Sequence, residues 1–329
     1  MAKTKPIAFP DCVQALSQVE ADFLGRKGVQ GLAVGVRTVN GKETGELCVK
    51  VYVRKKQDRA QLSDQEALPS HITLPDGRFV PVDLEEMAPL WAGGGPVCAL
   101  QGSSRAQMPY RVRPAMGGYS VGHYLSTAGT IALAVRDSHS PSVFYILSNN
   151  HVLAQSNDAE FADPILQPGP ADGGRCASDT IAYLCRCVAI NFEAGSSNLV
   201  DAAIACVAFG DTERRVYGIG YPRAVRGHAG LQLGELVQKT GRTTGYTQGR
   251  IIGLEGTVTV NYSRGRAAQF HRQIITSNMS AGGDSGSVGL DMNGNALGLL
   301  FAGSGSHTIF NYIDEVQTQL GIVVAEQTI

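Results

Sequence analysis

Short apolar runs separated by glycine turns dominate the chain beyond residue 118. They recur about every ten residues, a spacing typical of antiparallel β-barrels or sandwiches. Five of them are Thr130–Val135, Val143–Leu147, Ala202–Val207, Ile251–Val260 and Ala296–Ala302. The 40 glycines among 329 residues favour the same turn-rich architecture, because glycine adopts the backbone conformations of tight turns. We therefore expect a mainly β protein of two or three domains.

The N-terminal segment has another pattern and predicts a small α+β domain over residues 1–91. A helix is expected where apolar residues recur at helical spacing before Gly25, at Val13, Leu16, Val19 and Phe23. Three strands should follow, at Leu32–Val36, Leu47–Val53 and Arg78–Leu84. Glycine and proline then punctuate residues 92–118, which makes this stretch the best linker candidate.

Charge and cysteine content exclude several classes of partner. The 28 basic and 29 acidic residues give a net charge of −1, so we expect neither nucleic acid nor a membrane as partner. No signal peptide or membrane-spanning run is evident, and seven cysteines cannot all pair within the chain, which favours reduced thiols in the cytoplasm. Cys185 and Cys187 are interpreted as buried strand thiols, because zinc-binding pairs usually have wider spacing. No metal or cofactor is expected.

Small residues surround one serine in the run Ser280–Gly286, with Asp284 as its acidic neighbour. Such a loop suits a nucleophile, because the backbone N–H groups of Gly283 and Ser285 could together hold a negative oxygen. Ser285 is therefore the candidate nucleophile.

A serine hydroxyl needs a histidine to accept its proton and an acid to orient that histidine. His151 follows an apolar strand and small polar residues, and Asp201 opens a strand in which a buried carboxylate needs a partner. Each also has a purely structural interpretation, as a strand-end histidine satisfied by a neighbour and as an aspartate bonded to turn amides. The chain order histidine, aspartate, serine is that of chymotrypsin-type enzymes, whereas subtilisins and α/β-hydrolases use other orders.

Three motifs carry a resemblance to trypsin-like, chymotrypsin-fold serine peptidases over about residues 115–320. Gly283–Ser287 resembles their nucleophile loop, Leu147–Val152 their histidine motif and Asp201–Ala205 their acid segment. Further runs resemble the bacterial group related to the plant narrow-leaf proteins, which also carry a small N-terminal domain: Gly129–Ala132, Pro164–Pro170, Gly241–Gly245, Met279–Ser287 and Gly298–Ser304.

The resemblance implies two six-stranded antiparallel β-barrels, one over residues 119–215 with His151 and Asp201, the other over 216–329 with Ser285 and a C-terminal helix. It implies attack by Ser285, proton transfer by His151, orientation by Asp201, and an oxyanion hole made by the N–H groups of Gly283 and Ser285. Asp284 should pair within the chain, without removal of a propeptide.

The resemblance also suggests a substrate pocket. Met279 would lie at its floor, or would simply be core, and Phe301, Ala302 and Gly303 would form the strand that pairs with the substrate backbone. Because Met279 is uncharged, we expect a small or apolar side chain before the cleaved bond.

The function implied is that of an intracellular, regulatory serine endopeptidase that cleaves protein or peptide substrates through an acyl-enzyme. A homo-oligomer formed through the N-terminal domain is expected. Two alternatives keep the fold: a scaffold or partner-binding protein with latent activity, and an esterase.

Overall fold

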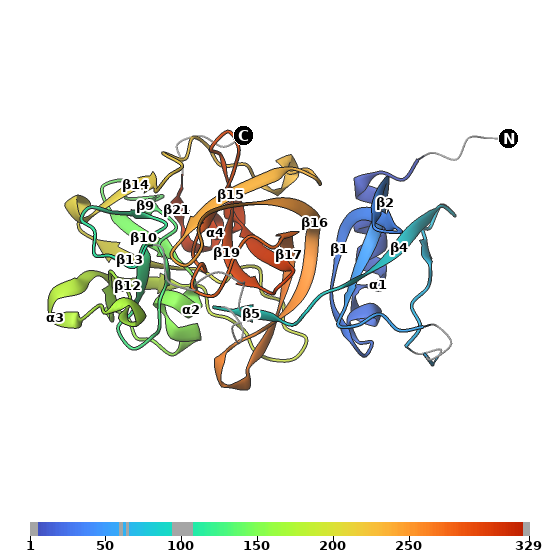
Figure 1. Cartoon of the computed structure of the whole chain (residues 1–329), viewed down its shortest axis with the longest axis horizontal. Helices are drawn as coiled ribbons and strands as arrows, with labels where there is room; N and C mark the ends of the chain where they lie inside the picture. Colours follow the sequence, from blue (N-terminus) through green and yellow to red (C-terminus); the bar gives the residue numbers. More distant parts are fainter. Residues whose placement is uncertain (1–5, 59–61, 64–65, 94–107, 325–329) are drawn as a thin grey trace.

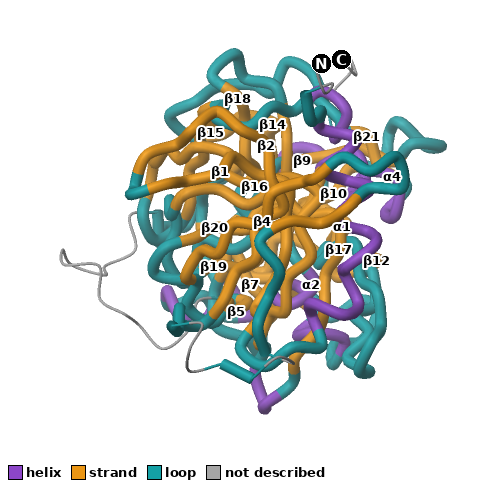
Figure 2. Tube along the Cα trace, turned by 90° about the vertical axis from the view of Figure 1, so that its right-hand side faces the viewer, coloured by secondary structure: helices purple, strands orange, loops and turns teal. Residues whose placement is uncertain are grey.

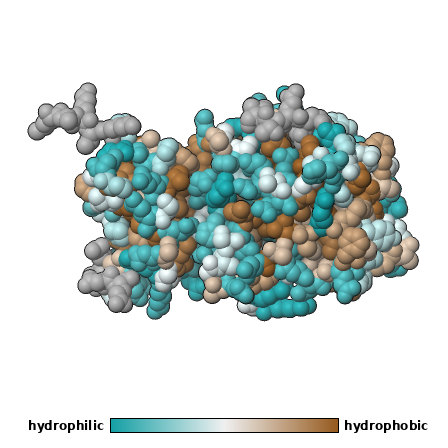
Figure 3. All heavy atoms as spheres, turned by 180° about the vertical axis from the view of Figure 1, so that it is seen from behind, coloured by the Kyte–Doolittle hydropathy of each residue, from teal (hydrophilic) through white to brown (hydrophobic). Residues whose placement is uncertain are grey.

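Figure 1 shows a computed structural model of the chain, which describes residues 6–58, 62–63, 66–93 and 108–324. A small N-terminal unit lies at one end of a larger β body, and the expected mainly β class is confirmed. On the rear face, hydrophobic and hydrophilic residues interleave (Figure 3). In the described part of the chain, no helix has the length and apolar character needed to cross a membrane.

The N-terminal unit is one helix packed on a sheet, as the sequence predicts. The helix α1 (Phe9–Leu24) buries Leu16 and Phe23 against the sheet. The strands are β1 (Val29–Val39), β2 (Lys42–Val53), β3 (His71–Thr73) and β4 (Phe79–Glu86). Burial of one helix face on the sheet stabilises both, because neither element alone removes its apolar surface from water.

The N-terminal sheet continues directly into the β body through one strand pair. Strand β1 pairs antiparallel with β16 (Gly245–Asn261), with Gly31 opposite Val258. A Cβ at Gly31 would lie 2.5 Å from the carbonyl oxygen of Thr257, so only glycine permits this close approach. The unit is therefore held by backbone pairing as well as by side chains.

The second half of the body contains six strands that pair in a closed circuit. Their order is β15 (Leu236–Gly241), β18 (Val288–Asp291), β19 (Ala296–Gly303), β20 (His307–Tyr312), β17 (Ala267–Ser277) and β16, which pairs with β15 again. A seventh, short strand, β5 (Leu90–Ala92), pairs with both β16 and β19.

The first half of the body is an eight-stranded sheet. Its order is β21 (Ile322–Val323), β9 (Ala134–Asp137), β10 (Phe144–Ser148), β13 (Ala203–Val207), β12 (Thr180–Cys187), β11 (Pro164–Leu166), β7 (Ser120–His123) and β8 (Gly129–Thr130). Among the described strands this sheet is an open path, so the expected pair of closed six-stranded barrels stays a proposal.

The remaining elements connect these sheets. Strand β6 (Ala115–Gly117) pairs with β14 (Thr212–Val216), and the C-terminal helix α4 (Ile313–Leu320) leads into β21, which returns to the first sheet. Two single-turn helices are α2 (Asn150–Leu153) and α3 (Cys176–Asp179). Of the predicted linker, residues 94–107 lie outside the described residues, while its two ends belong to β5 and β6.

One apolar cluster joins the two sheets into a common core. It combines Leu147 and Ile204 of the first sheet with Val288 and Leu299 of the second and Ile313 of α4. All five are fully or almost fully buried, so the two halves are packed like a single interior.

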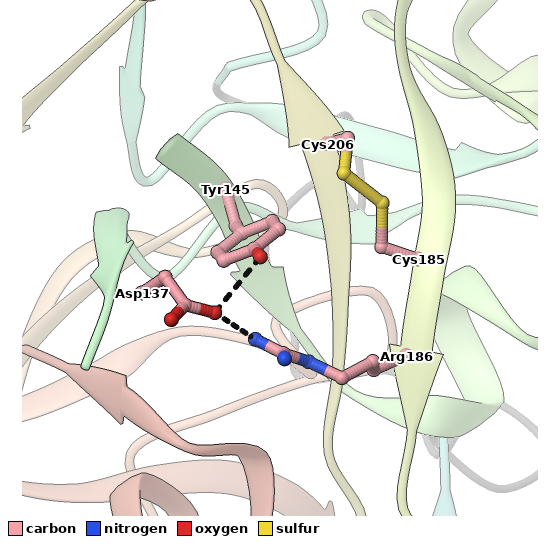
Figure 4. Close-up of a disulfide and its surroundings, with 5 residues drawn as sticks. All are labelled: Asp137, Tyr145, Cys185, Arg186 and Cys206. Carbon is pink, nitrogen blue, oxygen red and sulfur yellow. Dashed lines mark hydrogen bonds and ion pairs between the residues drawn. A yellow bond between two sulfur atoms is a disulfide. The ribbon is translucent and has the colours of Figure 1, made fainter. Parts of the chain in front are cut away.

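The interpretation of Cys185 and Cys187 as buried thiols is wrong. Cys185 forms a disulfide with Cys206 on the neighbouring strand, with the two Cα atoms 5.8 Å apart, and Cys187 is exposed (Figure 4). The two strands bring these side chains within bonding reach. The next residue, Arg186, contacts Asp137, whose carboxylate also accepts a hydrogen bond from Tyr145 (Figure 4).

A pH-dependent contact fastens the N-terminal unit to β20. The carboxylate of Glu85 accepts from Lys50 and lies 3.0 Å from His307 Nε2. Burial raises the pKa of Glu85, but the bonds to His307 and Lys50 outweigh it and lower the pKa from 4.5 to about 2.

We expect Glu85→Gln to lower the free energy of unfolding by about 1–2 kcal/mol at neutral pH. Because the folded-state pKa is depressed, this contribution is complete above pH 4.5 and is lost as the pH falls towards 2. Urea unfolding of both proteins across this range measures it. A difference that does not change with pH would contradict the assignment.

Candidate active site

The candidate site lies where the two halves of the body meet. His151 stands on α2, directly after β10, and Asp201 lies just before β13 in the same sheet. Ser285 comes from the loop between β17 and β18 of the other half. Two hydrogen bonds cross the junction there, from Thr130 N to the Ser285 carbonyl at 2.8 Å and from Thr130 Oγ1 to the Gly283 carbonyl at 2.8 Å.

Asp201 and His151 form a short, buried contact. The His151 Nδ1 atom lies 2.6 Å from Asp201 Oδ2, and the His151 backbone N–H donates to Oδ1 at 3.1 Å. The aspartate is fully buried. A carboxylate acceptor holds the proton on Nδ1 and leaves Nε2 free to accept one. The contact that the sequence predicts between these two residues is therefore present.

A third donor to this carboxylate, Tyr262, is absent from the sequence-based expectations. Its hydroxyl donates to Asp201 Oδ2 at 2.8 Å, and its ring is buried edge-on to His151. Burial and the Asp201 charge raise the pKa of Tyr262 well above its usual value, so the phenol keeps its proton and remains a donor. No motif marks Tyr262, because it contacts Asp201 across 61 positions of sequence.

Asn149 and Asn311 fix the backbone on which Asp201 sits. Asn149 Nδ2 donates to the Asp201 carbonyl at 2.7 Å, and the Asp201 N–H donates to Asn311 Oδ1 at 2.9 Å. Asn311 belongs to β20, so this bond also ties the acid to the other half of the body. Polar groups of a buried residue that are all satisfied hold one geometry.

The serine loop has the shape of an anion-binding turn. Gly283 and Gly286 both have φ of +96°, and a Cβ at Gly286 would lie 2.1 Å from the Thr130 carbonyl oxygen. The N–H groups of Gly283 and Ser285 have no hydrogen-bond acceptor among the described residues. Two free backbone donors two positions apart are the groups that a site for a negative oxygen requires.

Ser285 and His151 do not bond to each other. Ser285 Oγ lies 3.4 Å from the carbonyl oxygen of Phe301, while His151 Nε2 is buried without a partner among the described residues. Nucleophile and base often align only when substrate is bound. The hydrogen bond between Ser285 Oγ and His151 Nε2 that the sequence-based hypothesis requires is therefore not made in this structure.

Asp284 stabilises the serine loop through an internal ion pair. Its Oδ2 lies 3.2 Å from Lys239 Nζ and 2.6 Å from Thr244 Oγ1, and its Oδ1 accepts from the N–H groups of Thr243 and Thr244. Both charged side chains are fully enclosed. Burial lowers the pKa of Lys239, against the opposing attraction of Asp284. The sequence predicts an internal partner for Asp284, and that partner is Lys239.

The residues of the predicted substrate pocket lie in two settings. Met279 packs in an apolar cluster with Val237, Leu300 and Phe310, so its side chain is part of the core. Phe301, Ala302 and Gly303 end strand β19 beside Ser285. The role of Met279 as a pocket floor stays a prediction.

We expect Lys239→Met to destabilise the protein by about 3–5 kcal/mol, because it leaves a buried carboxylate without its counter-charge. The double variant Lys239→Met with Asp284→Asn should recover part of that loss. Urea unfolding of the three proteins measures both effects. Equal losses in the single and double variants would show that the ion pair does not hold the loop.

Comparison with known proteins places the two parts separately. Residues 18–85 match the family model described as the NARROW LEAF 1 N-terminal domain. Among curated proteins none matches the sequence.

Solved serine proteases resemble the body. Thermobifida fusca protease A and Nocardiopsis protease each share 18% identity, with TM-scores of 0.45, and Cellulomonas bogoriensis chymotrypsin shares 20%, with a TM-score of 0.43. Each match covers 63% of this chain and 96% of the other. The chain combines a segment matching the NARROW LEAF 1 N-terminal domain with a similarity to solved serine proteases over 63% of its length.

Proposed function

We propose that the protein is a serine endopeptidase in which Ser285, His151 and Asp201 act together. The observation that carries the proposal is the 2.6 Å contact between His151 Nδ1 and Asp201 Oδ2, with the opposite ring nitrogen free. Because Nδ1 holds its proton toward Asp201, Nε2 is the ring nitrogen that can accept a proton from another group. We assign that proton to the Ser285 hydroxyl, the nucleophile that the sequence motif and the chain order indicate.

In the proposed reaction, Nε2 takes the proton of Ser285 Oγ as the oxygen attacks a peptide carbonyl. The N–H groups of Gly283 and Ser285 then stabilise the negative oxygen, and the imidazolium gives its proton to the departing amine. Water repeats the sequence on the acyl-enzyme. Tyr262 and the His151 backbone N–H donate to the Asp201 carboxylate and hold it in place against the imidazole.

The substrate's backbone would pair with the end of β19, at Phe301, Ala302 and Gly303. We further propose that the residue before the cleaved bond is small or apolar. Met279 offers no charge, and a Cβ built on Gly303 would lie only 3.2 Å from Ser280 Oγ. No propeptide removal is needed in this scheme, because Lys239 already supplies the partner of Asp284.

One observation favours a latent form of the same site. Ser285 Oγ is engaged with the Phe301 carbonyl rather than with His151. A scaffold or partner-binding protein with dormant catalytic groups would show this arrangement.

Assembly through the N-terminal unit and a cytoplasmic location also stay proposals. The Cys185–Cys206 bond is evidence against the cytoplasmic location, because disulfides persist in oxidising environments.

Labelling with a fluorophosphonate probe tests the proposed chemistry. We expect the wild type to react and Ser285→Ala and His151→Ala to lose reaction by at least about 10³-fold. Turnover of casein or an apolar peptide would then separate a peptidase from an esterase. Labelling that survives in Ser285→Ala would place the reactive group elsewhere, and absence of labelling in every preparation would favour the scaffold.

Tyr262→Phe tests the third donor to Asp201. Removing the hydroxyl weakens the hold on the carboxylate that orients His151, so we expect kcat to fall about tenfold with little change in KM. Tyr312→Phe is the matched control, because it also deletes a buried phenol hydroxyl, one bonded to Glu255 away from the site. Equal losses in both variants would mean that Tyr262 acts only on overall stability.

A further inference from the structure

Strand β5 occupies the edge to which we assign the substrate backbone. It runs antiparallel to β19, with Ala92 opposite Ala302 and Trp91 opposite Gly303, and parallel to β16, with Leu90 opposite Val260. In both Figure 1 and Figure 2 it reaches the body beside β19. An antiparallel peptide could not pair with Ala302 and Gly303 while β5 is in place.

A buried anchor fixes β5 in this position. Leu90 is fully buried and packs in the cluster that contains Phe301, Ile309 and Tyr262. Its carbonyl accepts a hydrogen bond of 2.9 Å from Asn261 Nδ2. An apolar side chain removed from water and a bonded backbone are the two features by which added strands bind a sheet edge.

The chain then reaches the candidate base. A Cβ on Gly93 would lie 3.7 Å from His151 Cδ2 and 3.8 Å from Nε2, which is in van der Waals contact with the ring. The same Nε2 has no partner within the described residues, and Ser285 Oγ is turned to the Phe301 carbonyl. With φ of +76°, Gly93 leaves the extended conformation just at this point.

We propose that β5 is an internal mimic of the substrate backbone. It blocks the edge of β19 in the resting protein, and the left-handed turn at Gly93 keeps its backbone from being presented as an extended, cleavable bond. The peptide that replaces it is an extended strand with an apolar side chain at the Leu90 position and a small residue beside His151. This inference rests on the proposed function for its catalytic consequence, but the occupancy of the edge does not.

Tethering determines how such a strand acts. A segment held in the same chain competes at an effective concentration of about millimolar, so a substrate must displace it before binding. The apparent affinity for substrate is reduced by the fraction of molecules whose edge is occupied. Displacement therefore alters KM, while kcat, set by the groups beyond the edge, is kept.

Leu90→Asp is the first test, because a buried, unpaired carboxylate should expel β5. We expect the KM for an apolar peptide to fall about tenfold, the fluorophosphonate labelling rate to rise by a similar factor, and kcat to remain unchanged. Ile190→Ala is the matched control, since it truncates another buried side chain of the same apolar cluster that does not belong to β5. Faster labelling in the control as well would overturn the proposal.

A second measurement needs no catalysis. Trp91 is the chain's single tryptophan, so its fluorescence reports β5 alone. The test titrates Ser285→Ala with a heptapeptide that has the sequence of residues 87–93 but carries Trp91→Phe. We expect a saturable shift of Trp91 emission to longer wavelength as β5 enters water, and no shift with the same peptide carrying Leu90→Asp in addition.

The two measurements separate the two ideas. A shift with the apolar peptide supports β5 as the displaceable occupant, even when no protein is labelled, and that combination would overturn only the proposed peptidase activity. No shift with either peptide, together with equal labelling of wild type and Leu90→Asp, would overturn the role of β5 and leave the peptidase activity standing.

Discussion

The buried carboxylate of Asp201 is the constraint around which the two halves of the body are arranged. A fully buried charge is tolerated only where hydrogen bonds replace water. Here the donors come from different places: His151 from helix α2 in the same half, and Tyr262 from the residue after β16 in the other half. The Asp201 N–H is in turn held by Asn311 of β20. If the two halves separated, Asp201 would lose its hydrogen bonds to Tyr262 and Asn311. The site and the domain junction therefore stabilise each other.

The serine loop also contains a buried charge, that of Asp284, and here an opposite charge balances it. Lys239 of β15 and the residues Thr243 and Thr244 of the turn that follows contact the Asp284 carboxylate. These groups fix the positive-φ turns at Gly283 and Gly286, and the backbone N–H groups of Gly283 and Ser285 have no acceptor among the described residues. The donors of an oxyanion hole are preorganised in this way, by bonds that lie behind them.

Local patterns in the sequence predict the elements well and the long-range contacts poorly. The helix α1 and the strands of the N-terminal unit follow from spacing alone, and the His151–Asp201 contact follows from motif and order. Tyr262, Lys239 and the Cys185–Cys206 bond have no local signature, since each depends on which strands become neighbours. Leu90 and Trp91 were expected to end the N-terminal domain. Their pairing with β19 depends on a sheet edge assembled more than 200 residues later.

The pairing of β1 with β16 links the N-terminal unit to the candidate site. Strand β16 pairs with β1 and with β5, and it is followed directly by Tyr262, which donates to Asp201. A partner that favours a different position of the N-terminal unit would therefore act on the occupant of the edge through the chain that leads into β5. By linkage, a peptide that displaces β5 must change the affinity for such a partner by the same factor. If β5 acts as proposed, the binding of a substrate and of such a partner would be coupled through one equilibrium, in which the buried contacts of Leu90 favour the occupied edge.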